Sequence, residues 1–162
     1  MYFLGIDIGS LSCDAVLIDA GGQVAASAVV PTGAKNREAI ARVTDEVFRR
    51  SGIERAALKG VVSTGYGRDR VEERLAAVTE ITCHARGMRS LNSATRILID
   101  IGGQDSKCIA LSPEGTVVNF AMNDKCAAGT GRFLEAMARA LCGDIDDLGS
   151  LDEGARGTHA IS

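Results

Sequence analysis

One cysteine stands directly before a small, glycine-broken stretch and an amphipathic run. Cys126 is followed by Ala-Ala-Gly-Thr-Gly, and apolar residues then recur at helical intervals from Phe133 to Leu141. This spacing predicts a helix over 132–141 and places Cys126 at or just before its N-terminal end, where free backbone N–H groups and the helix dipole favour negative charge. A thiolate in that position is a better nucleophile or metal ligand. The local sequence leaves a second interpretation open, an inert buried cysteine before an ordinary helix.

Two aspartates also stand where they could do chemistry. The sequence Ile-Asp-Ile-Gly occurs at 6–9 and again at 99–102, so that Asp7 and Asp100 each lie at the end of an apolar run and before a glycine turn. Such a site suits a magnesium-bound phosphate, because turn amides and hydroxyls hold phosphate oxygens while the carboxylate holds metal-bound water. Either motif alone is weak, since Asp and Gly are common in turns.

The elements that position these aspartates follow the same order twice. Each aspartate lies in a first predicted strand, a turn and a second strand follow, and a Gly-containing turn leads to a third strand. The predicted strands are 3–8, 15–18 and 24–30 in the first copy, and 97–101, 108–111 and 116–121 in the second. This internal repeat is far more specific than one motif, and it predicts one phosphate site that uses both aspartates. No GxxxxGK[ST] sequence is present, so the site is not a P-loop.

The other segments are predicted from the periodicity of apolar residues and from the glycines and other turn residues that end helices and strands. Helices are expected over 36–50, ending at Ser51-Gly52, and over 81–93. Residues 60–63 form a short strand candidate, and the glycine-rich bend after it is either a ligand contact or a plain turn. Residues 144–149 are expected to be an acidic connector, and residues 158–162 resemble the start of a strand.

Composition limits the function classes. The chain has 162 residues, a net charge of −3 and no Lys/Arg cluster, and its lack of Trp argues further against a nucleic-acid surface. No apolar run approaches the ~20 residues of a membrane span, and no leader is recognised at the start. The five cysteines are an odd number without a CxxC pair, which favours free thiols and a cytoplasmic location.

Five motifs in the same order resemble one family, the ATP-dependent activators of 2-hydroxyacyl-CoA dehydratases and the related ATPase subunits of benzoyl-CoA reductases. The motifs lie at 5–10, 63–68, 83–85, 100–105 and 123–133. The resemblance implies an α/β fold of the actin, heat-shock-protein-70 and sugar-kinase type. Two related ribonuclease H-like lobes are then expected, 1–94 and 95–162, with the second cut short.

The resemblance also implies the cofactors. These are Mg-ATP and one [4Fe-4S] cluster shared across a homodimer, with Cys126 as the first of two thiolate ligands from each subunit. Asp7, Asp100 and Gln104 would be catalytic, with both aspartates holding magnesium through water. The phosphate-binding residues would be Gly9, Ser10, Leu11, Ser12, Gly102, Gly103 and Gln104.

The implied activity is ATP-driven transfer of one electron to a 2-hydroxyacyl-CoA dehydratase or benzoyl-CoA reductase-type partner, with ferredoxin or flavodoxin as donor. Two features depart from the family. Asp14 stands where a Lys or other polar residue is usual, and neither the second cluster cysteine nor the adenosine-binding glycine motif is present. The chain therefore resembles an N-terminal portion. A cluster-free small-molecule kinase of the same fold, and a module without activity of its own, are the alternatives.

Overall fold

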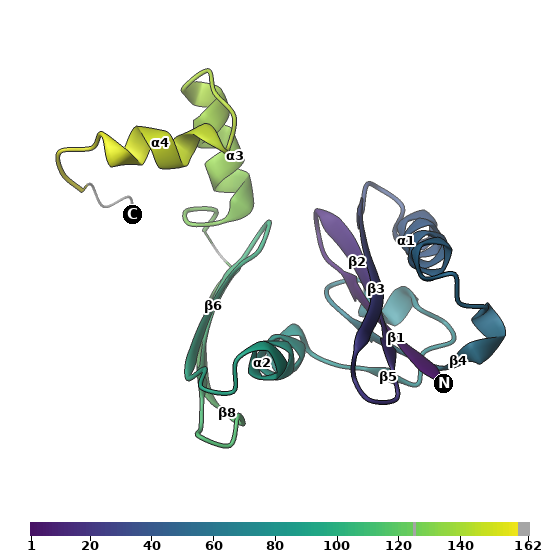
Figure 1. Ribbon diagram of the computed structural model, residues 1–162. Helices are drawn as coiled ribbons and strands as arrows, with labels where there is room; N and C mark the ends of the chain where they lie inside the picture. Colours follow the sequence, from purple (N-terminus) through teal and green to yellow (C-terminus); the bar gives the residue numbers. More distant parts are fainter. Residues whose placement is uncertain (125, 159–162) are drawn as a thin grey trace. The chain divides into compact units, whose positions relative to one another are not determined.

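Glycine turns and alternating apolar residues build the first part of the chain around a five-stranded sheet. The computed structural model describes residues 1–124 and 126–158, in two compact units, Met1–Gly87 and Met88–Ser162. Figure 1 shows the helices and strands of each unit. The first unit contains β1 (Tyr2–Ile8), β2 (Ser12–Asp19), β3 (Val24–Pro31), α1 (Asn36–Ser51), β4 (Leu58–Thr64) and β5 (Ala76–Ala77), with 3₁₀ turns at Arg55–Ala57 and Arg68–Arg70.

The order of strands in this sheet is β3-β2-β1-β4-β5. The first three strands form the predicted antiparallel meander, and β4 then pairs in parallel with β1 after the crossover through α1. Alternate residues of β1, namely Leu4, Ile6 and Ile8, are buried on the face that packs against α1. The opposite side of β1 therefore carries Asp7.

Helix α1 ends where the sequence predicts. Gly52 adopts a left-handed conformation with φ of 66°, and its N–H donates to the Phe48 carbonyl at 3.0 Å. Glycine reaches this conformation without a Cβ clash, which is why the Ser-Gly pair stops the helix. Val43 and Val47 lie on the buried face of the helix and are fully buried in the core of this unit.

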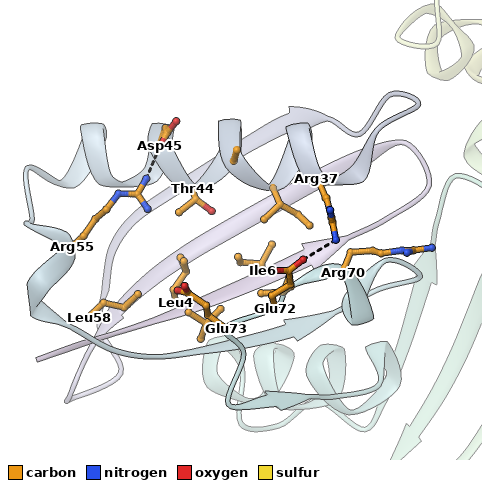
Figure 2. Close-up of a pocket in the computed structure, with 14 residues that line it drawn as sticks. Leu4, Ile6, Arg37, Thr44, Asp45, Arg55, Leu58, Arg70, Glu72 and Glu73 are labelled. Atoms are coloured by element: carbon orange, nitrogen blue, oxygen red, sulfur yellow. Dashed lines mark hydrogen bonds and ion pairs between the residues drawn. The ribbon is translucent and has the colours of Figure 1, made fainter.

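A cavity of about 540 Å³ lies between α1 and the β1–β4 part of the sheet. Figure 2 shows an apolar floor that includes Leu4 and Ile6, and a charged rim where Arg37 and Glu72 form an exposed ion pair at 2.7 Å. None of the residues predicted to bind phosphate lines this cavity. It is therefore separate from the site predicted at the glycine turns.

The second unit repeats the meander. Strands β6 (Ile97–Ile101), β7 (Ser106–Leu111) and β8 (Val117–Asn123) form an antiparallel sheet in the order β6-β7-β8. Helices α3 (Gly131–Ala140) and α4 (Asp147–Glu153) follow, while α2 (Glu80–Leu91) contains the division between the two units. That division, between Gly87 and Met88, comes earlier in the chain than the predicted lobe boundary.

Helix α4 was not predicted. The acidic stretch expected to be a connector leads into the short helix α4, whose first residue, Asp147, accepts a hydrogen bond from the Asp144 N–H at 2.8 Å. Acidic side chains favour the first turn of a helix, so the same residues that read as a solvated linker also begin this helix. Residues 159–162 of the expected C-terminal strand lie outside the described residues.

Candidate functional site

The first glycine turn joins β1 to β2. Within it the Gly9 N–H donates to the Ser12 carbonyl at 2.9 Å, and the Thr32 hydroxyl donates to the Gly9 carbonyl at the same distance. The predicted phosphate-binding residues Ser10 and Leu11 form the tip of this tight turn. Thr32, which directly follows β3, therefore stabilises the turn through this hydrogen bond. The sequence did not predict this contact.

The glycine-rich bend after β4 packs directly against Asp7. Gly65 has φ of +85°, and a Cβ in its place would lie 2.3 Å from Asp7 Oδ1. The N–H of Gly67 donates to the Ile8 carbonyl at 3.0 Å. Any larger side chain at Gly65 would displace the carboxylate, so this bend positions Asp7 and is more than a plain surface turn.

Asp14 lies opposite Asp7 in the β1–β2 register. Its Oδ2 accepts a hydrogen bond from the Ser12 hydroxyl at 2.9 Å. Residues that face each other across an antiparallel pair project from the same side of the sheet, so two carboxylates share this side. Burial, together with the negative charges of Asp14 and Asp7, raises the pKa of the neighbouring Cys13 thiol to about 12.

The second turn has the same construction. Asp100 is the penultimate residue of β6. The Gly102 N–H donates to the Asp105 carbonyl at 2.9 Å, and a Cβ on Gly102 would lie 2.7 Å from Asp105 Oδ1. Gln104 is exposed at the turn. In the β6–β7 register Asp100 lies opposite Lys107, as Asp7 lies opposite Asp14. The predicted repeat is thus confirmed strand for strand in the two meanders.

Lys107 is the residue of this site that sequence reasoning missed. Its Nζ donates to Asp105 Oδ1 at 2.7 Å and to Asp100 Oδ2 at 3.3 Å, and Lys107 and Asp105 are only 5% and 4% exposed. The ammonium group of Lys107 therefore offsets the negative charge of Asp100, the second of the two predicted aspartates. The internal repeat could have identified Lys107, because it makes Lys107 the counterpart of Asp14: each follows its aspartate by seven positions (14 − 7 = 107 − 100 = 7).

The Cys126 loop connects β8 to α3. Cys126 is exposed, and the Ala128 N–H lies 3.5 Å from its Sγ. Asn123 holds the loop from the end of β8: its Oδ1 accepts from the Cys126 N–H at 3.2 Å, and its Nδ2 donates to the Cys126 carbonyl at 3.1 Å. Lys125, part of the 123–133 motif, lies outside the described residues.

The helix after Cys126 begins within one residue of the predicted position 132. Thr130 is its N-cap and Gly131 its first residue, so the loop 126–130 separates the thiol from the helix. The first helical amides are engaged elsewhere: the N–H groups of Gly131 and Arg132 donate to the carbonyls of Gly102 and Gly103 at 2.8 and 3.1 Å. Free helix amides therefore do not surround Cys126, and the second glycine turn is tied to α3 instead.

The donor chemistry decides what the cysteines can hold. A [4Fe-4S] cluster takes four thiolates, and an exposed thiol beside a backbone N–H suits one of them. Within residues 1–124 and 126–158, no group of three or more His, Cys, Asp or Glu side chains could hold a metal ion. The described residues by themselves therefore provide no complete cluster or metal site. No helix among them combines the length and the apolar composition that a membrane crossing needs.

Comparison with known proteins shows the family of the chain. Residues 4–162 match the family described as the BadF/BadG/BcrA/BcrD ATPase family. The chain is 45% identical over 162 residues to the Anaerotignum propionicum protein named activator of lactoyl-CoA dehydratase, covering 100% of this chain and 62% of that protein. The chain spans about three fifths of the length of the curated relatives that it matches most fully.

Two solved structures are similar over the whole chain. One is an activator of the 2-hydroxyisocaproyl-CoA dehydratase from Clostridium difficile with bound ADPNP, at 40% identity and a TM-score of 0.88, covering 100% of this chain and 60% of that one. The other is component A of the Acidaminococcus fermentans (R)-2-hydroxyglutaryl-CoA dehydratase, at 37% identity and a TM-score of 0.90. The match covers 100% of this chain and 62% of that one.

A more distant structure shows the fold alone. The ROK hexokinase from Thermus thermophilus is 17% identical with a TM-score of 0.53, covering 96% of this chain and 70% of that one. Together with the two whole-chain matches, this likeness confirms the predicted fold of the actin, heat-shock-protein-70 and sugar-kinase type.

Proposed function

The chain belongs to the BadF/BadG/BcrA/BcrD ATPase family, and on that premise we propose that it is part of an ATP-dependent activator of a 2-hydroxyacyl-CoA dehydratase-type enzyme. Such an activator passes one electron from a [4Fe-4S] cluster to its partner. One observation carries the proposal: the turn after Asp100 is hydrogen-bonded to the start of the helix that follows the exposed Cys126. A nucleotide turn and a thiol loop are therefore built into one unit.

Each glycine turn is a candidate phosphate site in its own unit. Backbone N–H groups and the Ser10 and Ser12 hydroxyls of the first turn would bind phosphate oxygens, and the turn Gly102–Gln104 would bind them in the same way in the second unit. Asp7 and Asp100 would position magnesium, through water, and the attacking water, and Gln104 would be a further catalytic residue. Positioned charge of this kind supplies most of the rate in phosphoryl transfer.

The two aspartates are not equivalent in this scheme. Asp100 shares Lys107 with Asp105, whereas Asp7 lies opposite a second carboxylate, Asp14. The magnesium ion of Mg-ATP is therefore bound more favourably at Asp7 than at Asp100. The reason is that two neighbouring carboxylates repel each other unless a cation lies between them. Asp14 in this setting favours magnesium on the first turn and does not block the phosphate.

Cys126 is one ligand of the cluster. A [4Fe-4S] cluster supplies a single-electron carrier whose potential depends on hydrogen bonds to its sulfurs. The Ala128 N–H is placed to donate to the Cys126 sulfur, at 3.5 Å. The other ligands come from outside the described residues: a second thiolate of the same subunit and the equivalent pair of a homodimeric partner. The electron donor is a ferredoxin or flavodoxin, and the location is the cytoplasm.

The test is the iron content of the full-length protein purified without oxygen. We expect the wild type to be brown and dimeric, and we expect Cys126→Ser to lose most of its iron and acid-labile sulfide. Cys142→Ser is the matched control, because Cys142 is also exposed but lies beyond the other end of α3. Unchanged iron in Cys126→Ser would remove the cluster assignment, and an iron-free protein that phosphorylates a small molecule would support a kinase.

A further inference from the structure

The start of α3 is fixed to the second glycine turn. The first N–H groups of a helix have no partner within the helix. Here those of Gly131 and Arg132 donate to the Gly102 and Gly103 carbonyls, at 2.8 and 3.1 Å. A change in the position of this turn therefore acts directly on the first residues of the helix.

Ser106 makes a second attachment, to the thiol loop itself. Its Oγ donates to the Gly129 carbonyl at 2.6 Å. Ser106 is the first residue of β7, and its neighbour Lys107 binds Asp105 and Asp100. Successive residues of a strand point to opposite sides, so the start of β7 holds the acidic turn on one side and the Cys126 loop on the other.

The loop between these attachments is itself held by side chains. Thr130 is fully buried and donates its hydroxyl proton to the Ala127 carbonyl at 2.6 Å. Asn123 binds the backbone of Cys126 and also donates to the Ala128 carbonyl at 3.3 Å. With its ends held in this way, the loop follows Ser106 and Gly131 when they move.

We propose that Ser106 and Gly131 are positioning residues that couple the Gly102–Asp105 turn to Cys126, so that phosphate binding at the turn changes the exposure of the thiol. The inference rests on the proposed function, because it takes this turn as the phosphate site. It assigns the coupling to three hydrogen bonds within one unit, those donated by Gly131, Arg132 and Ser106.

Two variants at Gly131 distinguish the effect of losing the hydrogen bond from the effect of adding a side chain. Gly131→Pro has no N–H, and its ring carbon cannot lie where the Gly102 carbonyl is now bound, while proline is accepted at the first position of a helix. Thr130 before it has φ of −105° and ψ of 163°, close to the range that a residue preceding proline favours. Gly131→Ala keeps the N–H, and its Cβ would be 3.4 Å from the Gly102 carbonyl oxygen.

The readout is the rate of Cys126 alkylation by iodoacetamide in iron-free full-length protein, resolved by mass spectrometry. The exposed Cys108 and Cys142 are internal references. Without nucleotide, we expect Gly131→Pro and Ser106→Ala to react about fivefold faster at Cys126 than Gly131→Ala, the population shift expected when one hydrogen bond is lost. Ser106→Thr, which keeps the hydroxyl, should restore the slower rate.

Saturating Mg-ATP should change the Cys126 rate in the wild type and Gly131→Ala, and should leave it unchanged in Gly131→Pro and Ser106→Ala. Equal nucleotide-free rates in the two Gly131 variants, or a full response to Mg-ATP in Ser106→Ala, would overturn the coupling. Failure of the proposed function is a separate result, because calorimetry would then show no Mg-ATP binding by the wild type. The nucleotide-free comparison decides the coupling in that case.

Discussion

At the scale of single residues, the five cysteines illustrate what environment does to one functional group. Cys13 is fully buried on the core face of β2, whereas Cys108, Cys126 and Cys142 are exposed. Cys83 is half-buried, and burial raises the pKa of its thiol, with the charge of Asp7 adding to the shift and a hydrogen bond with Thr64 opposing it. Only the exposed thiols are available as ligands or to reagents, and Cys126 is the one held in a glycine-rich loop.

The raised pKa of Cys13 predicts a loss of stability at alkaline pH. Its pKa rises from 9.0 to about 12 on folding, so the unfolded chain releases this proton first. Stability from this group is complete below pH 9 and is lost as the pH rises from 9 towards 12. Urea unfolding measured across this range should show a shallower pH dependence for Cys13→Ala than for Cys108→Ala, an exposed control. Identical slopes would show that Cys13 does not contribute.

At the scale of elements, the sequence predicted the positions of the strands better than the contacts that connect them to loops and helices. Alternating apolar residues and Gly-Gly turns defined both meanders, and Gly52 defined the end of α1. The bounds of α3 were predicted to within one residue, but the partners of its first amides were not, because they come from a turn almost thirty residues earlier in the chain. Lys107 was missed for a similar reason: its burial depends on strand pairing, and a lysine after Asp-Ser reads as exposed.

Lys107 also gives the clearest stability prediction at this scale. Replacing it with Met leaves the buried carboxylate of Asp105 without its lysine, and breaking a buried pair in this way costs about 3–5 kcal/mol. Arg37→Met is the control, because its ion pair with Glu72 is exposed and should contribute less than about 1 kcal/mol. If urea unfolding gives similar losses for both variants, the Lys107 cluster has no special structural role.

At the scale of the whole molecule, the family, the fold and the repeat agree. The same register places Asp7 and Asp100 before equivalent turns in the two units, and the whole-chain relatives are activators of 2-hydroxyacyl-CoA dehydratases. The chain spans about three fifths of the length of those relatives, so the expected adenosine-binding motif and second cluster cysteine remain predictions. The proposed partner enzyme leaves no pattern in the glycine turns, so the sequence does not specify it.

The most direct test of this account is a calorimetric titration of the full-length protein with Mg-ATP. We predict one site per chain, weakened about tenfold or more in Asp7→Asn, because a charged hydrogen-bond partner of the metal-bound water is lost. Asp19→Asn is the matched control, since Asp19 lies at the other end of β2, where its side chain accepts the Gly21 and Gln23 N–H groups of the next turn. Equal affinity in the two variants, or no binding by the wild type, would contradict a nucleotide site that uses Asp7.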